Sequence, residues 1–557
     1  MVVAERVSGR ERLTSERREG LPAFTVIALV FLAILWPELH FVPIWDGQLY
    51  ANCAIEAAAN GLAGMTMESL RCGGHPSQGY IVFLAASQLL HFGDIAALHV
   101  TNILLGLLAL ASIRVVLARI VPDKARVRQL DLVTLLCAVH PVLLSTLLQV
   151  NVDFGVYVFF FATLAALMSE RFWLATFAGV LLCFSKETGV LAYVLMVGLD
   201  VAFRIRPAGP PSERLRRALP LWMMPLPVVL FGMHVLWWNA THAKAAVWHG
   251  WQQGTLEGFR FFDLSDAVLA GYAAGIFVLG FMWVVSGFIA ADLLRGGVRM
   301  ARRLPNRAVP GADPVRLAYL GVLTFLLTYL LTSFRTWSNL RYFALLYPLL
   351  VMLAFAAMLR LGMKWRMRTA ALLAIGVLFM LSVFRSWDPF SRAVYGTFSV
   401  GEHDMYRMSS FNGVWAGRGR DELVYNLQFT GLHWALNSLY AAIKPTAATT
   451  IVFPRSNRWG LWSPLDARTF ERVAARTGTV TPDYADEAMI SGRGDRKPRE
   501  LWLVGQPNDT DSLALQRLHR RDYTDADSAR YTARGLIVTA RHLVLRDVPV
   551  LVSTQHR

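Results

Sequence analysis

Charged residues are scarce in this sequence. Asp, Glu, Lys and Arg together make up 17% of its 557 residues, whereas hydrophobic residues make up 55%. This composition excludes an ordinary soluble protein, in which the charged fraction is higher. No internal repeat or low-complexity segment stands out either, and the lack of repeated halves weighs against a transporter. The chain is therefore expected to lie in a membrane.

Acidic residues are outnumbered by basic ones, 39 against 55, which gives a net charge of +16. The basic residues gather between long apolar runs, where they set topology and meet anionic headgroups, so the charge does not indicate nucleic-acid binding. By the positive-inside rule these clusters are cytoplasmic. They cover residues 118–129, 204–217, 292–316 and 360–368.

A removable signal peptide is also lacking. The first apolar run, 21–41, has no small-residue cleavage site, so it is read as an uncleaved anchor. With the basic clusters inside, the apolar runs predict 11 crossings and a cytoplasmic amino terminus. The expected spans are 21–41, 95–117, 131–149, 154–169, 172–185, 188–203, 218–237, 265–291, 317–334, 342–359 and 369–385.

One apolar run is too short for a crossing. Residues 79–92 number only 14, against the roughly 20 that a spanning helix needs. We read this run as a helix lying on the outer surface or dipping into it. The stretch 42–94 then forms one external loop with helices beside the membrane.

The expected fold is an α-helical polytopic membrane protein of the 11 helices above, with a C-terminal α/β domain outside. Residues 1–20 form the cytoplasmic amino terminus, 21–385 the membrane domain and 386–557 the soluble domain. Within the tail, 421–443 has apolar residues at helical spacing. Short apolar runs at 449–454, 500–505 and 535–546 predict strands.

Cysteine is rare, with four in the chain. Cys53 and Cys72 both fall in the external loop, whereas Cys137 and Cys183 fall in apolar spans. Two cysteines in an oxidising compartment can form a disulfide. Spacing alone does not fix their geometry, so a bridge and two buried thiols both stay open.

The predicted topology sends isolated polar side chains to one face of the membrane. Cations there can bind a phosphate headgroup, a carboxylate can take a proton from a hydroxyl, and apolar spans can hold a lipid. Sugar transfer from a lipid phosphate uses all three. The side chains are Asp46, Glu56, Arg71, His75, Asn151, Asp153, Lys186, Glu187, His242, Lys244, His249, Arg260, Arg335, Asn339 and Arg341.

Each residue taken singly also has a plainer interpretation. Asp46 is a good helix cap, and Glu56 fits a solvated helix face. Lys186 and Arg341 fit interfacial anchors that extend their charges toward water. His75 precedes a proline and fits a residue that shapes a turn.

Four segments, taken in order, resemble the GT-C glycosyltransferases, and most closely the branch of protein O-mannosyltransferases and aminoarabinose transferases. WDGQLY (45–50) resembles the acidic motif of the first outer loop, and HPSQGYIVFLAASQLLHFGD (75–94) is similar to the His/Lys-Pro-Pro segment. NVDFGVYVFFFATLAALM (151–168) and LLCFSKETGVLAYVL (181–195) resemble the Asp-containing and Thr-Lys-Gly/Glu turns. RYFALLYPLLVML (341–353) is similar to the Arg-Tyr…Pro entry into a later span.

The resemblance implies roles for these residues. Asp46 would be the catalytic base, and Asp153 would assist at the acceptor or position the loop. Lys186 and Arg341 would hold the donor phosphate, with His75 nearby. Candidates for acceptor binding or for support of the site are Glu56, Arg71, Glu187 and Arg335. The sequence departs from the family at Gly47, where a second acidic residue is common, and at Ser77, where a second proline is usual.

The resemblance further implies an inverting reaction from a polyprenyl-phosphate sugar at the periplasmic face of a bacterial inner membrane. The acceptor would be a cell-envelope glycan, lipid A or a protein, and no nucleic acid is involved. No metal-ligand pattern stands out, although a divalent cation stays open because the metal requirement varies across GT-C enzymes. Two other functions also stay open, a flippase for a lipid-linked glycan and a non-catalytic scaffold of envelope assembly. The sugar itself is not identified.

Overall fold

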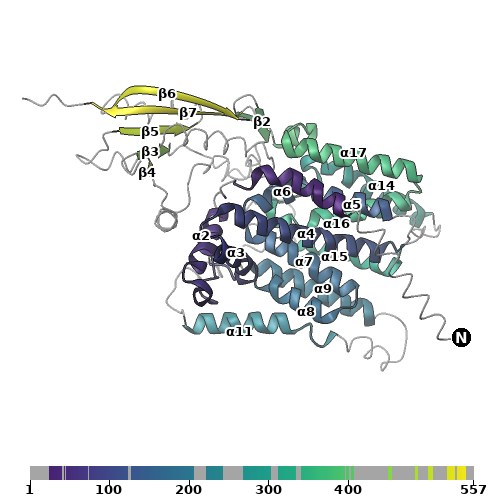
Figure 1. Ribbon diagram of the computed structural model, residues 1–557. Helices are drawn as coiled ribbons and strands as arrows, with labels where there is room; N and C mark the ends of the chain where they lie inside the picture. Colours follow the sequence, from purple (N-terminus) through teal and green to yellow (C-terminus); the bar gives the residue numbers. More distant parts are fainter. Residues whose placement is uncertain are drawn as a thin grey trace, which may run out of the picture.

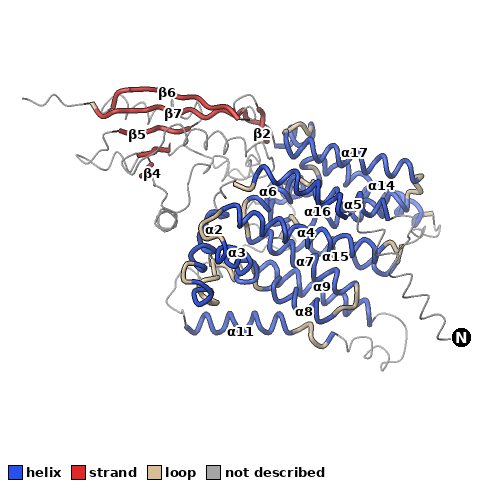
Figure 2. Tube along the Cα trace, in the orientation of Figure 1, coloured by secondary structure: helices blue, strands red, loops and turns tan. Residues whose placement is uncertain are grey.

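Helices dominate the described part of the chain, and the strands described there all lie after residue 396 (Figures 1 and 2). The structure is a computed structural model, and it describes residues 24–40, 43, 46–72, 74–122, 127–205, 221–241, 267–302, 312–333, 340–395, 397–400, 403–406, 450–453, 483–486, 500–505, 523–533 and 536–546.

The helical part begins with Phe24–Glu38. The helices that follow are α2 (Asp46–Ala58), α3 (Gln78–Leu90), α4 (Ile95–Ile120), α5 (Val127–Ala138), α6 (Pro141–Leu148), α7 (Val152–Met168), α8 (Phe172–Cys183), α9 (Glu187–Ile205), α11 (Leu226–Thr241), α13 (Ala267–Phe277), α14 (Met282–Ala301), α15 (Pro314–Thr332), α16 (Leu346–Arg360), α17 (Trp365–Phe384) and α18 (Pro389–Tyr395).

Helix α7 forms the centre of this helical body. Every one of its residues except Ala162 is buried, as expected for a helix that is hydrophobic on all sides. It packs along α4 and α8, which cover it on two sides. Its first turn is fixed by Asn151, whose side chain accepts a hydrogen bond from the backbone amide of Asp153 at 3.1 Å.

Among the described residues, five helices are long and apolar enough to cross a membrane by themselves, which makes the chain a multi-pass membrane protein. These are α4, α9, α15, α17 and the run Leu279–Ala301 that contains α14. Helices α5 and α6 give a sixth span if they are counted together. Six further apolar helices, including α7 and α16, are 10–17 residues long. Eleven of these twelve units lie in the stretches expected to cross, and the twelfth is α3, which was expected not to cross; the number of crossings stays a prediction.

Two predicted spans are not continuous helices. The span expected at 131–149 bends by 50° between α5 and α6, where Pro141 cannot donate to the preceding turn. The span expected at 265–291 is broken at Leu279–Phe281 (η5), where Gly280 and Phe281 take left-handed backbone angles of φ 61° and 68°. Both stretches contain helices, as expected, and each stays a predicted span with an interruption that the sequence analysis did not foresee.

Asp388 stabilises the second break. This buried carboxylate accepts hydrogen bonds from the amide of Phe281 at 2.9 Å and from the indole of Trp283 at 3.0 Å. It therefore caps the amino-terminal turn of α14 from a residue more than 100 positions later in the sequence.

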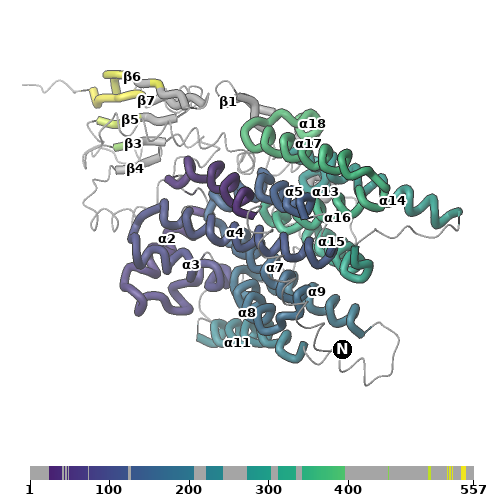
Figure 3. The backbone as a smooth tube through the Cα atoms, turned by 45° about the vertical axis from the view of Figure 1, so that its right-hand side comes forward, coloured from purple at the N-terminus to yellow at the C-terminus, as the bar shows by residue number. Residues whose placement is uncertain are grey.

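The loop expected at 42–94 contains two helices and a short turn between them. Helix α2 is followed by a 3-10 turn at Gly61–Gly64 (η2), and α3 begins at Gln78. Helix α3 packs on α2, α4, α7 and α8, and Figures 1 and 3 both show α2 and α3 together at one end of the helical body. A helix in the run 79–92 is therefore confirmed.

The tail contains two sheets. Strands β1 (Thr397–Val400) and β2 (His403–Tyr406) form an antiparallel pair. The larger sheet has five strands in the order β4-β3-β5-β7-β6, in which β4, β3 and β5 are parallel and β5, β7 and β6 are antiparallel. The strands of this sheet are β3 (Thr450–Phe453), β4 (Asp483–Asp486), β5 (Glu500–Gly505), β6 (Tyr523–Ala533) and β7 (Leu536–Leu545).

Strands β3, β5 and β7 confirm the three strands predicted from apolar runs. The helix predicted at 421–443 lies outside the described residues. The sequence analysis did not predict β6, because its residues are largely polar and give no hydrophobic alternation.

Candidate functional site

A buried cluster of three charged side chains lies at the amino-terminal end of α7. The carboxylate of Asp153 accepts a hydrogen bond from Lys186 Nζ on Oδ1, at 2.7 Å, and from Arg341 Nε on Oδ2, at 3.1 Å. The side chains of Asp153, Lys186 and Arg341 are only 4%, 7% and 6% exposed. We call these three residues the charged triad. Buried charges are tolerated when they are paired in this way.

The charged triad carries one positive charge in excess, since two cations share one carboxylate. Burial disfavours the ammonium form of Lys186, but the carboxylate of Asp153 outweighs this effect and raises the pKa of Lys186 above its usual value. Lys186 Nζ also lies 4.0 Å from the centre of the Tyr342 ring, whose face attracts cations. A water-poor site with a net positive charge favours the binding of an anion.

The triad is assembled from three separate parts of the chain. Asp153 lies in the first turn of α7, Lys186 in the turn between α8 and α9, and Arg341 in the 3-10 turn Leu340–Phe343 (η6). The turn before α9 is tight because Gly189 lies against the backbone of Leu182, where a Cβ would come within 2.2 Å of the carbonyl oxygen. This close approach sets the position of the turn that carries Lys186 relative to α8.

A second ion pair lies beside the triad. His75 Nδ1 is 2.9 Å from Glu187 Oε2, and Glu187 directly follows Lys186 in the chain. The amide of Gly79, at the start of α3, donates to the carbonyl of Phe184 at 2.8 Å. The segment that carries His75 is thereby docked against the turn that carries Lys186.

Arg71 extends this polar cluster toward α11. Its guanidinium lies 3.8 Å from the centre of the Trp238 ring. Burial lowers the pKa of Arg71 to about 10, although the nearby carboxylate of Glu187 acts in the opposite direction. Nearby, Gln78 Nε2 lies 3.2 Å from His234 Nε2. Two side chains of the external loop thus contact α11.

The backbone places the start of α2 beside the turn that joins α6 to α7. Helix α2 begins at Asp46, and the next residue, Gly47, is so close to the carboxyl-terminal cap of α6 that a Cβ would come within 1.6 Å of the carbonyl oxygen of Gln149. Gln149 precedes Asp153 by four positions. The side chain of Asp46 lies outside the described part of the structure. The contact explains why glycine, rather than a second acidic residue, follows Asp46 here.

The structure thus brings together most of the residues expected at the site, namely Arg71, His75, Asp153, Lys186, Glu187 and Arg341. Glu56 is exposed on α2. Arg335 lies outside the described residues, as do Asn339 and the candidates at 242, 244, 249 and 260.

Other residues at the site were not expected from the sequence. Tyr342 was missed although it directly follows Arg341, and Trp238 was not among the candidate residues. Gln78 and His234 gave no signal of their own. Among the described residues, no three His, Cys, Asp or Glu side chains are grouped in a way that would hold a metal ion.

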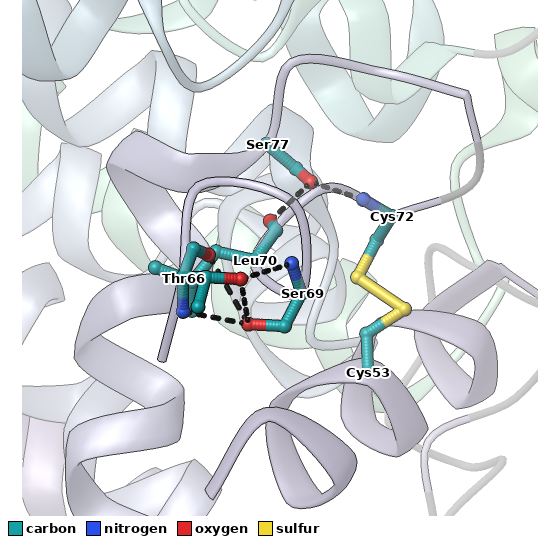
Figure 4. The surroundings of a disulfide bond; sticks show 6 residues. All are labelled: Cys53, Thr66, Ser69, Leu70, Cys72 and Ser77. Carbon is teal, nitrogen blue, oxygen red and sulfur yellow. Dashed lines mark hydrogen bonds between the residues drawn. A yellow bond between two sulfur atoms is a disulfide. The ribbon is translucent and has the colours of Figure 1, made fainter. Parts of the chain in front are cut away.

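The cysteine pair of the loop 42–94 is bonded in the structure. Cys53 of α2 and Cys72 form a disulfide, with their Cα atoms 6.1 Å apart (Figure 4). Cys137 and Cys183 are buried and free.

No protein-family model matches this chain, and no curated protein matches it in sequence. Among solved structures, it is similar to ArnT from Cupriavidus metallidurans bound to undecaprenyl phosphate, with 13% identity, a TM-score of 0.48 and coverage of 95% of this chain and 98% of that one. It is also similar to an oligosaccharyltransferase from Archaeoglobus fulgidus, with 12% identity, a TM-score of 0.38 and coverage of 65% and 54%. A third similar structure is the arabinofuranosyltransferase AftD from Mycobacteria, with 12% identity, a TM-score of 0.39 and coverage of 95% and 40%.

Proposed function

We propose that this protein is a membrane glycosyltransferase that transfers a sugar from a polyprenyl-phosphate donor to an acceptor hydroxyl, with inversion, at the periplasmic face. The observation that carries the proposal is the buried charged triad with its one excess positive charge. A phosphodiester has one negative charge, so its binding neutralises the site. The apolar helices around the site can receive the lipid chain of such a donor.

In this proposal Lys186 and Arg341 bind the donor phosphate. Their charges stabilise the negative charge that develops on the leaving phosphate in the transition state. Asp153 is a positioning residue, because its two carboxylate oxygens are already engaged by the cations, at 2.7 and 3.1 Å. The resemblance implied that Asp153 assists at the acceptor or positions the loop, whereas in this proposal it positions the two cations.

Asp46 is the proposed general base. As the acceptor hydroxyl attacks the anomeric carbon, Asp46 takes its proton, and the bond between that carbon and the phosphate oxygen breaks. The lipid phosphate leaves with the electrons of that bond. The contact of Gly47 with Gln149 supports this role, since it brings the start of α2 to the turn that directly precedes α7 and Asp153.

The loop 42–94 lies beside the site through the pairs His75–Glu187 and Arg71–Trp238. We propose that it limits the access of water, which would otherwise hydrolyse the donor. The glycan, lipid A or protein that accepts the sugar would approach from the same side.

The proposal is tested with purified protein in lipid nanodiscs, a panel of polyprenyl-phosphate sugars and candidate acceptors. Asp46→Asn should abolish transfer, by 100-fold or more, since general base catalysis contributes about 10²–10⁴-fold, while undecaprenyl phosphate binds as in the wild type. Glu68→Gln, an exposed acidic residue of the same loop, is the matched control and should retain full activity.

Three results would contradict the proposal. Full activity in Asp46→Asn would remove Asp46 from the role of base. Movement of the intact donor across the membrane without cleavage would instead identify a flippase. Neither cleavage nor movement with any donor of the panel would favour a scaffold of envelope assembly.

A further inference from the structure

The segment between Leu70 and Ser77 is a compact turn built around one buried hydroxyl. Ser77, which is completely buried, donates from Oγ to the carbonyl of Leu70 at 3.0 Å and accepts from the amide of Cys72 at 2.7 Å (Figure 4). Cys72 and His75 also pair as an antiparallel bridge. We call residues 70–77 the loop turn.

The loop turn carries residues of the proposed site. The side chain of His75 extends from the loop turn, and its Nδ1 lies 2.9 Å from Glu187 Oε2. The guanidinium of Arg71 lies over the Trp238 ring, 3.8 Å from its centre. Because the hydrogen bonds of Ser77 fix the backbone between these two residues, both side chains shift together if the loop turn shifts.

The disulfide ties the loop turn to α2. Cys72 is part of the turn, and Cys53 lies on α2, seven positions after the proposed base. The amino-terminal end of α2 lies against the turn between α6 and α7, through the close contact of Gly47 with Gln149. The bond therefore joins the helix that carries the proposed base to the segment that carries His75.

The charged triad does not depend on this connection. Its three residues come from α7, from the turn before α9 and from η6, none of which contains Cys53 or Cys72. A change in the disulfide should thus move the loop against the triad while the anion site itself is preserved.

We propose that the Cys53–Cys72 disulfide is a positioning element that makes the transfer reaction dependent on an oxidising compartment, an inference that rests on the proposed function. Cys53 is only partly buried, so a reductant can reach it. A dithiol supplies two electrons and two protons, becomes a cyclic disulfide itself, and leaves Cys53 and Cys72 as thiols. The loop turn then loses its covalent link to α2.

The test uses the full chain in nanodiscs, with and without dithiothreitol. The variants are Cys53→Ser with Cys72→Ser, and Cys137→Ala with Cys183→Ala as the matched control, which removes the two free, buried thiols. Reduction should lower kcat at least tenfold in the wild type and in the control, while the Kd for undecaprenyl phosphate stays within twofold. The Cys53/Cys72 variant should have the low kcat in both conditions.

Hydrogen–deuterium exchange gives a readout independent of catalysis. Reduction should raise exchange in residues 70–80 and leave α7 protected. An unchanged kcat after reduction overturns the proposal, as does a parallel loss of kcat and of undecaprenyl phosphate binding, which would indicate general unfolding. If the oxidised wild type transfers no sugar, the proposed function fails. In that case the exchange experiment still tests the positioning role of the disulfide, and unchanged exchange in residues 70–80 after reduction overturns that role.

Discussion

The excess positive charge of the triad predicts a specific effect of replacing Lys186 by methionine. Methionine has a similar length and no charge, so Lys186→Met lowers the net charge of the triad from plus one to zero. Asp153 keeps its hydrogen bond from Arg341 at 3.1 Å and is not left as an unpaired buried charge. The variant should therefore fold, unlike variants that isolate a buried charge at a cost of about 3–5 kcal/mol.

The magnitude follows from the bond that is lost. A hydrogen bond to a charged group contributes about 1.5–3 kcal/mol. Since every 1.4 kcal/mol is a factor of ten, the Kd for undecaprenyl phosphate should rise by about 10- to 150-fold. The assay is a titration of the protein in nanodiscs with undecaprenyl phosphate, in parallel with a thermal unfolding curve.

Arg204→Met is the matched control. Arg204 lies at the other end of α9, and its Nε is 2.7 Å from Asp200 Oδ2, so it too is a cation paired with a carboxylate near a helix end. This control should bind undecaprenyl phosphate within twofold of the wild type. Wild-type affinity in Lys186→Met, or an equal loss in Arg204→Met, would refute the assignment of the anion to the triad.

Two other predictions concern the start of α2 and the response to pH. Gly47→Ala should lower transfer at least tenfold, because its Cβ would come within 1.6 Å of the carbonyl oxygen of Gln149. The control Gly198→Ala should be active, because no described atom lies within 4 Å of the new methyl group. Equal activity of the two variants would show that the reaction does not require the close approach of α2 to Gln149. Because the pKa of Lys186 is raised above 10.5, its charge and the stability from its ion pair are complete below that pH and are lost only as pH rises through the raised pKa. The affinity for undecaprenyl phosphate should therefore be constant from about pH 7 to 9, and a titration showing a steep loss in that interval would contradict the pairing.

The residues of the site could be found from the sequence because each stands out against an apolar background. Asp153 and Lys186 are isolated charges at the ends of hydrophobic runs, and the positive-inside rule put both on one face. Their pairing could not be predicted in the same way. The contact between Asp153 and Arg341 joins residues 188 positions apart and depends on the packing of three helix ends.

The two helix breaks, between α5 and α6 and at η5, differ in whether the local sequence predicts them. Pro141 is a local signal, since proline disrupts the hydrogen bonds of a helix. The break at Gly280 lies in an apolar run without proline, and it depends on Asp388, which caps α14 from a distant part of the chain. Local patterns carry no information about such a partner.

The single surplus charge of the triad also bears on what happens after transfer. A donor diester carries one negative charge, whereas the spent carrier is a monoester with about −1.5 to −2 at neutral pH. Because the attraction between a phosphate and the cations of Lys186 and Arg341 grows with the charge of the phosphate, the same site should hold the spent carrier more firmly than a fresh donor. Departure of the lipid, rather than bond formation, would then set the turnover rate, and free undecaprenyl phosphate should act as a strong competitive inhibitor.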